Sequence, residues 1–140
     1  MARRTFDSVS VGDTFGPTEV AVGRGTLVAY ANASGDQNPI HQDEVFAKSV
    51  GLPDVIAHGM WTMGATSSVL AEWAGDAGAV VEFGTRFTKP VVVPQSGAAV
   101  SVTGVVKSVD EETRIALVDL TTTAGAEKVL GRCQARVQLA

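Results

Sequence analysis

The stretch AHGMWTMGATSSVLAEWAG, residues 57–75, decides the expected fold because it is the longest helical pattern in the chain. Apolar and small residues recur along it every three or four positions, the spacing that puts side chains on one face of a helix. These residues are Met60, Met63, Gly64, Ser67, Leu70, Ala71 and Ala74. The stretch is largely uncharged before Glu72. We therefore expect other structure to surround this helix, and its small residues to let a sheet approach closely.

Four strands are expected after this helix, where valine and threonine become common and apolar and polar residues alternate. They cover residues 80–88, 98–109, 114–123 and 128–139. In the fourth strand, Cys133, Ala135 and Val137 share one face, while Arg132 and Gln134 point the other way. Short connections join the last three strands into an antiparallel meander. The expected class is α+β, with one long central helix wrapped by a twisted antiparallel sheet.

The residues before the central helix predict a strand, two helices and a loop. We expect the strand at residues 14–22 and a short helix at residues 26–33. A second helix is expected from Asn38, its cap, to Gly51, because proline is favoured in the first turn of a helix and glycine just beyond its end. Residues 52–56 then form a loop that leads into the central helix.

Composition limits the class of protein. The chain has 140 residues, of which 45% are hydrophobic and 19% charged, as in soluble globular proteins, and this length predicts a single domain over residues 1–140. Eleven Lys and Arg against 15 Asp and Glu give a net charge of −4, which argues against a nucleic-acid binder. No run of about 18 apolar residues occurs, so we expect no membrane span. A single cysteine excludes a disulfide framework, and without an apolar leader we expect a cytoplasmic protein.

The segment SGDQNPIH, residues 34–41, carries the clearest functional signal. A helix start explains part of it, since Asn38 would cap, Pro39 would begin the helix and Asp36 would add negative charge at its positive end. Capping does not explain His41. A helix start favours the neutral imidazole, which accepts a proton near pH 7. If Asp36 faces the same space, the two residues form an acid–base pair without a nucleophile, which suits the addition or removal of water. Helix capping alone is the competing interpretation.

The start of the central helix offers a place for negative charge. The Gly59 amide would point out of the helix start towards a developing oxyanion, and a glycine lets a substrate approach the backbone closely. The competing interpretation makes Gly59 a tight turn and His58 a structural hydrogen-bond partner. Six possible metal ligands lie within 23 residues, but none has the spacing that places ligands on one helix face. They are Asp36, His41, Asp43, Glu44, Asp54 and His58. We therefore expect no metal.

Three blocks of the sequence resemble the MaoC-like hot-dog family of hydratases and dehydratases. They are SGDQNPIH at 34–41, AHGM at 57–60 and RFTKPV at 86–91, of which the first is the most specific. Their order and spacing also fit, and the resemblance covers nearly the whole chain. It implies a hot-dog fold and, without any cofactor, reversible syn addition of water to a trans-2-enoyl thioester, which gives the (3R)-hydroxyacyl thioester.

The resemblance also implies roles for individual residues. Asp36 and His41 would hold one water. In hydration Asp36 would deprotonate it while His41 delivers a proton to Cα, and in dehydration His41 would take that proton. The Gly59 amide would bind the thioester oxygen as negative charge builds on it. Four further positions would touch the substrate or support the site. They are Asn38, His58, Met60 and Ser68.

The same resemblance implies a dimer, formed either by two identical chains or with a second hot-dog subunit that supplies the acyl tunnel. Acyl carrier protein or CoA would carry the thioester, and a basic rim would attract either one. The rim candidates are Lys89, Lys107, Arg114, Lys128, Arg132 and Arg136. A hot-dog thioesterase, which releases free thiol, is the alternative enzyme. A non-catalytic acyl-binding subunit would lack Asp36 or His41, and both are present.

Overall fold

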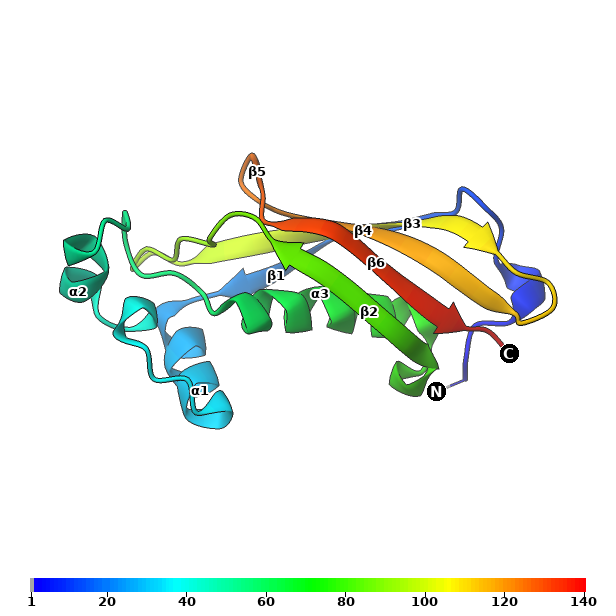
Figure 1. Cartoon of the computed structure of the whole chain (residues 1–140), viewed down its shortest axis with the longest axis horizontal. Coiled ribbons are helices and arrows are strands. Elements are labelled where there is room, and N and C mark those ends of the chain that lie inside the picture. Colours follow the sequence, from blue (N-terminus) through cyan, green and yellow to red (C-terminus); the bar gives the residue numbers. More distant parts are fainter. Residues whose placement is uncertain (1) are drawn as a thin grey trace.

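The computed structural model describes residues 2–140, in which a long helix lies along one face of an antiparallel sheet (Figure 1). The strand order is β1-β3-β4-β6-β2, and the short β5 pairs with β4. The strands are β1 Thr14–Val22, β2 Val80–Phe87, β3 Ala98–Val109, β4 Ile115–Ala124, β5 Glu127–Lys128 and β6 Leu130–Gln138. With the long helix α3 (Gly59–Ala74), this arrangement confirms the α+β class and the central helix that the sequence predicts.

The strand boundaries agree closely with those expected. β1 and β3 match at both ends, and β2 and β4 differ from the expected ranges by single residues. β3, β4 and β6 are neighbours in the sheet, which confirms the meander. The fourth expected strand is broken near its start, because residues Glu127–Lys128 pair with β4 as β5 and β6 begins only at Leu130.

The helix expected over residues 38–51 is two separate elements. η2 (Pro39–His41) is a single 3₁₀ turn, and α2 (Glu44–Ser49) begins after it. The break occurs because Asp43 acts as a second cap, and its carboxylate accepts from the Phe46 amide at 3.0 Å. The helix before them, α1 (Arg24–Ser34), starts two residues earlier than expected.

Helix α3 is buried on one side and open on the other. Its buried residues are Thr62, Ala65, Thr66, Val69, Leu70 and Ala74. The predicted repeat of small residues falls partly on the open side, where Gly64 is exposed and Met60 is 56% exposed. The expectation that this repeat faces the sheet was wrong for both residues. The helix is apolar or small on nearly every side, so its periodicity does not single out one face.

The core lies between α3 and the inner face of the sheet. Alternate residues of the central strands are buried there, and Val102, Val118 and Val137 are fully enclosed. Cys133 is a core residue, as predicted, and burial raises the pKa of its thiol. Within residues 2–140, no helix is both long enough and apolar enough to cross a membrane.

A buried pair of hydroxyl groups joins α3 to β4. Thr66 Oγ1 donates to the Thr62 carbonyl at 3.0 Å, and the Thr122 hydroxyl lies 2.7 Å from Thr66 Oγ1. Because the Thr66 proton is used on the carbonyl, Thr122 is the donor in the second bond. Thr66→Val would leave the buried Thr122 hydroxyl without an acceptor, and we expect it to lower the free energy of unfolding by about 1–3 kcal/mol.

The matched variant Thr122→Val should cost less, because Thr66 keeps its own acceptor at Thr62. Urea unfolding of the two single variants and the double variant measures the difference. The double variant should be less destabilised than Thr66→Val, since it leaves no buried hydroxyl unpaired. A larger loss in Thr122→Val than in Thr66→Val would contradict this assignment of donor and acceptor.

α1, η2 and α2 gather at one end of the sheet, beside the start of α3 (Figure 1). Arg24, the first residue of α1, donates from Nε to the Val93 carbonyl at 2.8 Å and pairs with Asp54 at 2.8 Å. The Ile56 amide donates to the Ile40 carbonyl at 3.2 Å. These bonds hold the predicted acid–base segment next to the loop that leads into α3.

Candidate active site

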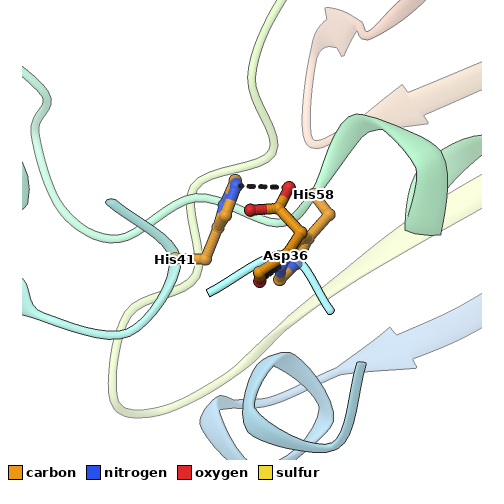
Figure 2. A group of neighbouring side chains, drawn as sticks. All are labelled: Asp36, His41 and His58. Atoms are coloured by element: carbon orange, nitrogen blue, oxygen red, sulfur yellow. Dashed lines mark hydrogen bonds and ion pairs between the residues drawn. The ribbon is translucent and has the colours of Figure 1, made fainter. Parts of the chain in front are cut away.

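The segment between α1 and η2 is held in shape by its own side chains. Asp36 Oδ1 accepts from the Asn38 amide at 3.1 Å, and Asn38 Oδ1 accepts from the Ile40 amide at 3.2 Å. Asn38 is therefore the cap that the sequence predicts. The Asp36 side chain is 52% exposed, and its second oxygen, Oδ2, faces His41 (Figure 2). The carboxylate thus meets solvent on one side and the imidazole on the other.

His41 is oriented by a backbone carbonyl. Its Nδ1 lies 2.7 Å from the Ile56 oxygen, and because a carbonyl only accepts, the neutral ring carries its proton on Nδ1. The lone pair is then on Nε2, which lies 3.9 Å from Asp36 Oδ2. This distance is too long for a direct hydrogen bond, and it leaves a position from which one water can contact both groups.

The expectation that His41 lies in the first turn of a longer helix was wrong. His41 is the last residue of a three-residue 3₁₀ turn, and α2 begins beyond it. Such a short turn has no appreciable dipole, so the Ile56 carbonyl selects the tautomer instead. The predicted convergence of Asp36 and His41 is present, but it depends on a contact with the loop before α3.

His58 lies beside this pair and supports it (Figure 2). Its Nε2 donates to the Asp36 carbonyl at 3.0 Å, and its ring stacks on that of His41 with 3.7 Å between centroids. The side chain is 2% exposed, and within the described part of the chain Nδ1 has no hydrogen-bond partner. His58 therefore ties the main chain of Asp36 to the start of α3 and packs against His41. This fits the interpretation of His58 as a structural hydrogen-bond partner.

The ligand atoms of Asp36, His41 and His58 lie within 4.8 Å of one another, which raises the question of a metal site. An imidazole nitrogen binds a metal through a lone pair in the plane of its ring. Here the two rings are stacked, with 22° between their planes, so their lone pairs run alongside each other and do not meet at one point. The arrangement suits proton transfer by His41 better than chelation by both histidines.

Two cavities meet at Gly59, the first residue of α3. One, of about 290 Å³, is lined by His41, and the other, of about 420 Å³, is lined by Asp36. Gly59 and Phe87 line both cavities. A Cβ atom on residue 59 would lie 3.1 Å from the Phe87 ring, so this ring packs directly on Gly59. The site therefore opens to both sides of a glycine that Phe87 covers.

The Gly59 amide is available to a ligand. Among residues 2–140, no backbone or side-chain group accepts a hydrogen bond from it. It lies at the N-terminus of a 16-residue helix, where the helix dipole favours negative charge. An oxygen that gains negative charge in either cavity can therefore be stabilised by this N–H group.

Of the two remaining predicted site residues, Met60 lines a cavity and Ser68 does not. Met60 lines the cavity that holds Asp36. Ser68 lies about two turns further along α3, where its hydroxyl donates to the Gly64 carbonyl, and it lines neither cavity. The structure gives Ser68 no contact with the site, so the predicted substrate contact does not fit it. Three contributors are missing from the sequence-based set: the Ile56 carbonyl, Tyr30 and Phe87. Only Phe87 had a signal, since it lies in the block at 86–91.

Comparison with known proteins gives consistent matches. Residues 8–125 match the family described as MaoC like domain. The chain is 45% identical over 65 residues, 46% of its length, to 3-hydroxyacyl-thioester dehydratase X of Mycobacterium tuberculosis, and it covers 22% of that protein. A solved structure named MaoC-like dehydratase superposes on 99% of the chain with a TM-score of 0.97 and 41% identity, and the chain covers 43% of it. The (R)-hydratase from A. caviae involved in PHA biosynthesis superposes on 95% of the chain and 98% of its own length, with a TM-score of 0.81 and 26% identity.

The chain thus spans less than half of the first two of these relatives. Proteins of the same fold form two-subunit assemblies, as in the solved ChsH1-ChsH2 and HadBC complexes of Mycobacterium tuberculosis, which are 17% and 22% identical to the chain and show likeness of fold alone. The long helix against a six-stranded sheet is the hot-dog fold of these structures. Because the family match extends over residues 8–125, most of the chain, this protein belongs to the MaoC-like family of hot-dog hydratases and dehydratases.

Proposed function

We propose that this protein catalyses reversible syn addition of water to a trans-2-enoyl thioester, which gives the (3R)-hydroxyacyl thioester. The observation that carries the proposal is the gap of 3.9 Å between Asp36 Oδ2 and His41 Nε2, beside the free amide of Gly59. Two groups that hold one water can deliver both of its parts to the same face of a double bond. The relatives named as a dehydratase and an (R)-hydratase support the reaction in both directions.

In hydration, the water lies between the Asp36 carboxylate and His41 Nε2. Asp36 orients it, and the Nε2 lone pair takes one of its protons as the oxygen bonds to Cβ. The π electrons move towards the thioester oxygen, and the imidazolium then gives its proton to Cα on the same face. The water is fully incorporated and His41 is neutral again. Dehydration follows the same steps in reverse.

This scheme changes the division of roles implied by the resemblance, in which Asp36 removed the proton from water. His41 begins the cycle without a proton on Nε2, because Nδ1 holds its proton against the Ile56 carbonyl. The proton that His41 delivers to Cα must therefore first come from the water. Asp36 orients that water and stabilises the imidazolium by its negative charge.

Gly59 acts on the thioester oxygen. The Cα–H bond next to a thioester is only weakly acidic, so a base alone does not form the enolate. The Gly59 N–H, at the positive end of α3, would donate to the oxygen as it becomes negative. A donor already in position needs no reorganisation during the reaction.

We also propose that the chain works as part of a pair of hot-dog subunits joined along β2. Among residues 2–140, this strand pairs with β6 alone and leaves its other edge open, and Val81 and Phe87 on it are 55% and 53% exposed. The opposite edge strand, β1, carries Pro17 and Glu19, residues that discourage further strand pairing. Sedimentation of the purified protein should show a dimer, and Val81→Arg should produce monomers. A wild-type monomer at every concentration would contradict pairing between identical chains and require a different second subunit.

The sequence resembles that of the catalytic B subunit of the two-subunit (3R)-hydroxyacyl-ACP dehydratase of the mycolic-acid pathway. The similarity is clear around Asp36, His41, Gly59 and Met63. We propose this subunit role as the more specific assignment. The partner would then be a non-catalytic hot-dog subunit that supplies the acyl tunnel.

The proposed function is tested with the purified chain and trans-2-butenoyl-pantetheine, a thioester without phosphate. We expect the absorbance of the enoyl group to fall and the (3R)-hydroxybutyryl thioester to form. Release of free thiol with the double bond intact would instead support a hot-dog thioesterase. No change in either signal from a folded dimeric sample would contradict a self-sufficient hydratase.

A further inference from the structure

Three cations of the chain stand out because no partner neutralises them. Arg86, Lys128 and Arg132 are exposed and take part in none of the ion pairs among residues 2–140. Two other cations without an acidic partner, Arg4 and Arg114, lie over the rings of Trp73 and Phe6. On a chain with a net charge of −4, three unpaired cations are a local excess of positive charge.

These cations come from neighbouring segments at one end of the sheet. Pairing of β2 with β6 puts Arg86 opposite Gly131, the residue before Arg132. Lys128 and Arg132 line one hollow of about 440 Å³, and the Thr88 hydroxyl donates to the Lys128 carbonyl at 3.0 Å. Figure 1 shows β5, which contains Lys128, close to the start of β6 and the end of β2. We call Arg86, Lys89, Lys128 and Arg132 the basic cluster.

Lys89 connects the basic cluster to the active site. It lines the cavity of about 290 Å³ that also contains His41 and Gly59. Its amide donates to the Val129 carbonyl at 3.5 Å, and Val129, which follows Lys128 in the chain, lines the same cavity. A long molecule whose reacting end lies at Gly59 can therefore leave the cavity past Lys89 and reach the other three cations.

The acidic groups near the basic cluster do not cancel its charge. Glu127 lies 3.9 Å from Lys89, and both side chains are more than half exposed. Asp119 also lines the hollow, but its carboxylate is 4.0 Å from Lys107 and accepts from Gln134 at 2.7 Å. The four cations of the cluster therefore face one acidic side chain that is not otherwise engaged.

The backbone at Arg132 is also unusual. Its φ is 45°, in the left-handed region that non-glycine residues seldom adopt, and it lies where the pairing of β2 and β6 shifts register. Bulges of this kind re-aim side chains beside functional sites. The bulge fixes the direction in which this unpaired arginine leaves the strand.

We infer that the basic cluster binds the phosphate end of the pantetheine arm that carries the substrate thioester. The inference rests on the proposed function and names the part of the substrate that lies outside the cavity. Arg and Lys are the residues that recognise phosphate through charge-assisted hydrogen bonds. CoA and acyl carrier protein share this phosphate chemistry, so the cluster serves whichever of them is the carrier.

The basic cluster corrects the rim expected from the sequence. Lys107 and Arg136 are paired with Asp119 and Glu82, at 4.0 and 3.7 Å. Arg114 lies over the Phe6 ring and 3.5 Å from the Ala140 carbonyl, beside the C-terminus. These three candidates have other partners and, unlike Lys89, line neither the cavity nor the hollow. Arg86 belongs to the cluster although the sequence-based rim left it out.

The test compares Lys128→Gln/Arg132→Gln with the matched control Arg3→Gln/Arg136→Gln, which removes the same charge from positions paired with Asp76 and Glu82. Each protein hydrates the butenoyl group on three carriers: CoA, holo acyl carrier protein and phosphate-free pantetheine. We expect the first variant to raise KM about tenfold for a phosphate-bearing carrier and to leave kcat within about twofold. The control should change KM less than about twofold on every carrier.

Each outcome separates the possibilities. A similar rise in KM with CoA and with carrier protein supports the phosphate that the two share. A rise with carrier protein alone would assign the loss to the acidic protein surface, and a rise with CoA alone to the nucleotide phosphates, and either would overturn the shared site. An equal loss on phosphate-free pantetheine, or equal behaviour of the two variants, overturns the phosphate site. Hydration of phosphate-free pantetheine by the unaltered protein reports the proposed function by itself. Its absence would therefore count against hydration by this chain alone and not against the cluster, whose binding of CoA can still be titrated directly.

Discussion

Replacing His41 by glutamine should lower kcat for enoyl-thioester hydration by about 10²–10⁴-fold. Glutamine keeps a neutral polar side chain of similar size, although its amide lies where Nε2 was and not where Nδ1 contacts the Ile56 carbonyl. It has no nitrogen lone pair basic enough to take a proton from water, so the step that depends on Nε2 is lost. Steady-state hydration at saturating substrate measures the effect on kcat.

Asp36→Asn is the matching variant on the other side of the water. The amide oxygen of asparagine can still accept from the Asn38 amide, as Asp36 Oδ1 does, so the turn can be preserved while the negative charge is removed. In the proposed mechanism both residues act on one water. The kcat of the double variant should therefore be close to that of the less active single variant. Rates within about fivefold of the wild type in both single variants would refute the acid–base pair.

Gly59→Pro should lower kcat by about 10²–10³-fold, because proline has no N–H to donate to the thioester oxygen. The local backbone favours this substitution. Residue 59 is the first residue of α3, a position where proline is common, and His58 before it has φ −59° and ψ 134°, the extended conformation that precedes proline. The helix should therefore form as before, which far-UV circular dichroism can verify.

Gly59→Ala provides the matched control for this variant. It adds a Cβ at the same place, 3.1 Å from the Phe87 ring, but keeps the N–H group. The difference in kcat between the alanine and proline variants therefore isolates the hydrogen bond from the crowding. If alanine and proline reduce kcat equally, Phe87 crowding accounts for the loss and the Gly59 amide has no role in the reaction.

The fold was largely predictable because its signals are local. The alternation of apolar and polar residues places β1 and β3 at their observed boundaries, and proline and glycine mark the connections between elements. The contacts that link these elements are not local. Gly64 and Met60 share the small and apolar repeat of α3, yet they lie on its open side, because the sheet packs against Thr62, Ala65 and Thr66 instead.

The features of the site were also predictable only where they depend on residues close together in the sequence. Asp36, Asn38 and His41 lie within six residues and form part of a recognisable block, so their proximity could be predicted. The orientation of His41 could not, because it depends on the Ile56 carbonyl, which lies 15 residues further along the chain. The Phe87 ring packs on Gly59 from a segment that is still further away in the sequence. No periodic pattern in the sequence predicts such a contact.

The basic cluster shows a further limit of sequence reasoning. Composition identifies 11 cationic residues, but it does not show which of them lack an acidic neighbour. Lys107 and Arg132 are equivalent candidates on charge alone, and only the structure pairs Lys107 with Asp119 and leaves Arg132 unpaired. Pairing across strands, rather than charge content, therefore selects the surface that we propose for the carrier.

The central claim is that Asp36 and His41 act on one water from one side of the double bond. The stereochemistry of hydration in deuterium oxide tests it most directly, because the deuteron at Cα marks the face on which His41 delivers its proton. We predict a 3R hydroxyl group with deuterium at Cα on the same face of the former double bond. Deuterium on the opposite face, or a 3S product, would contradict delivery of both parts of water by this pair.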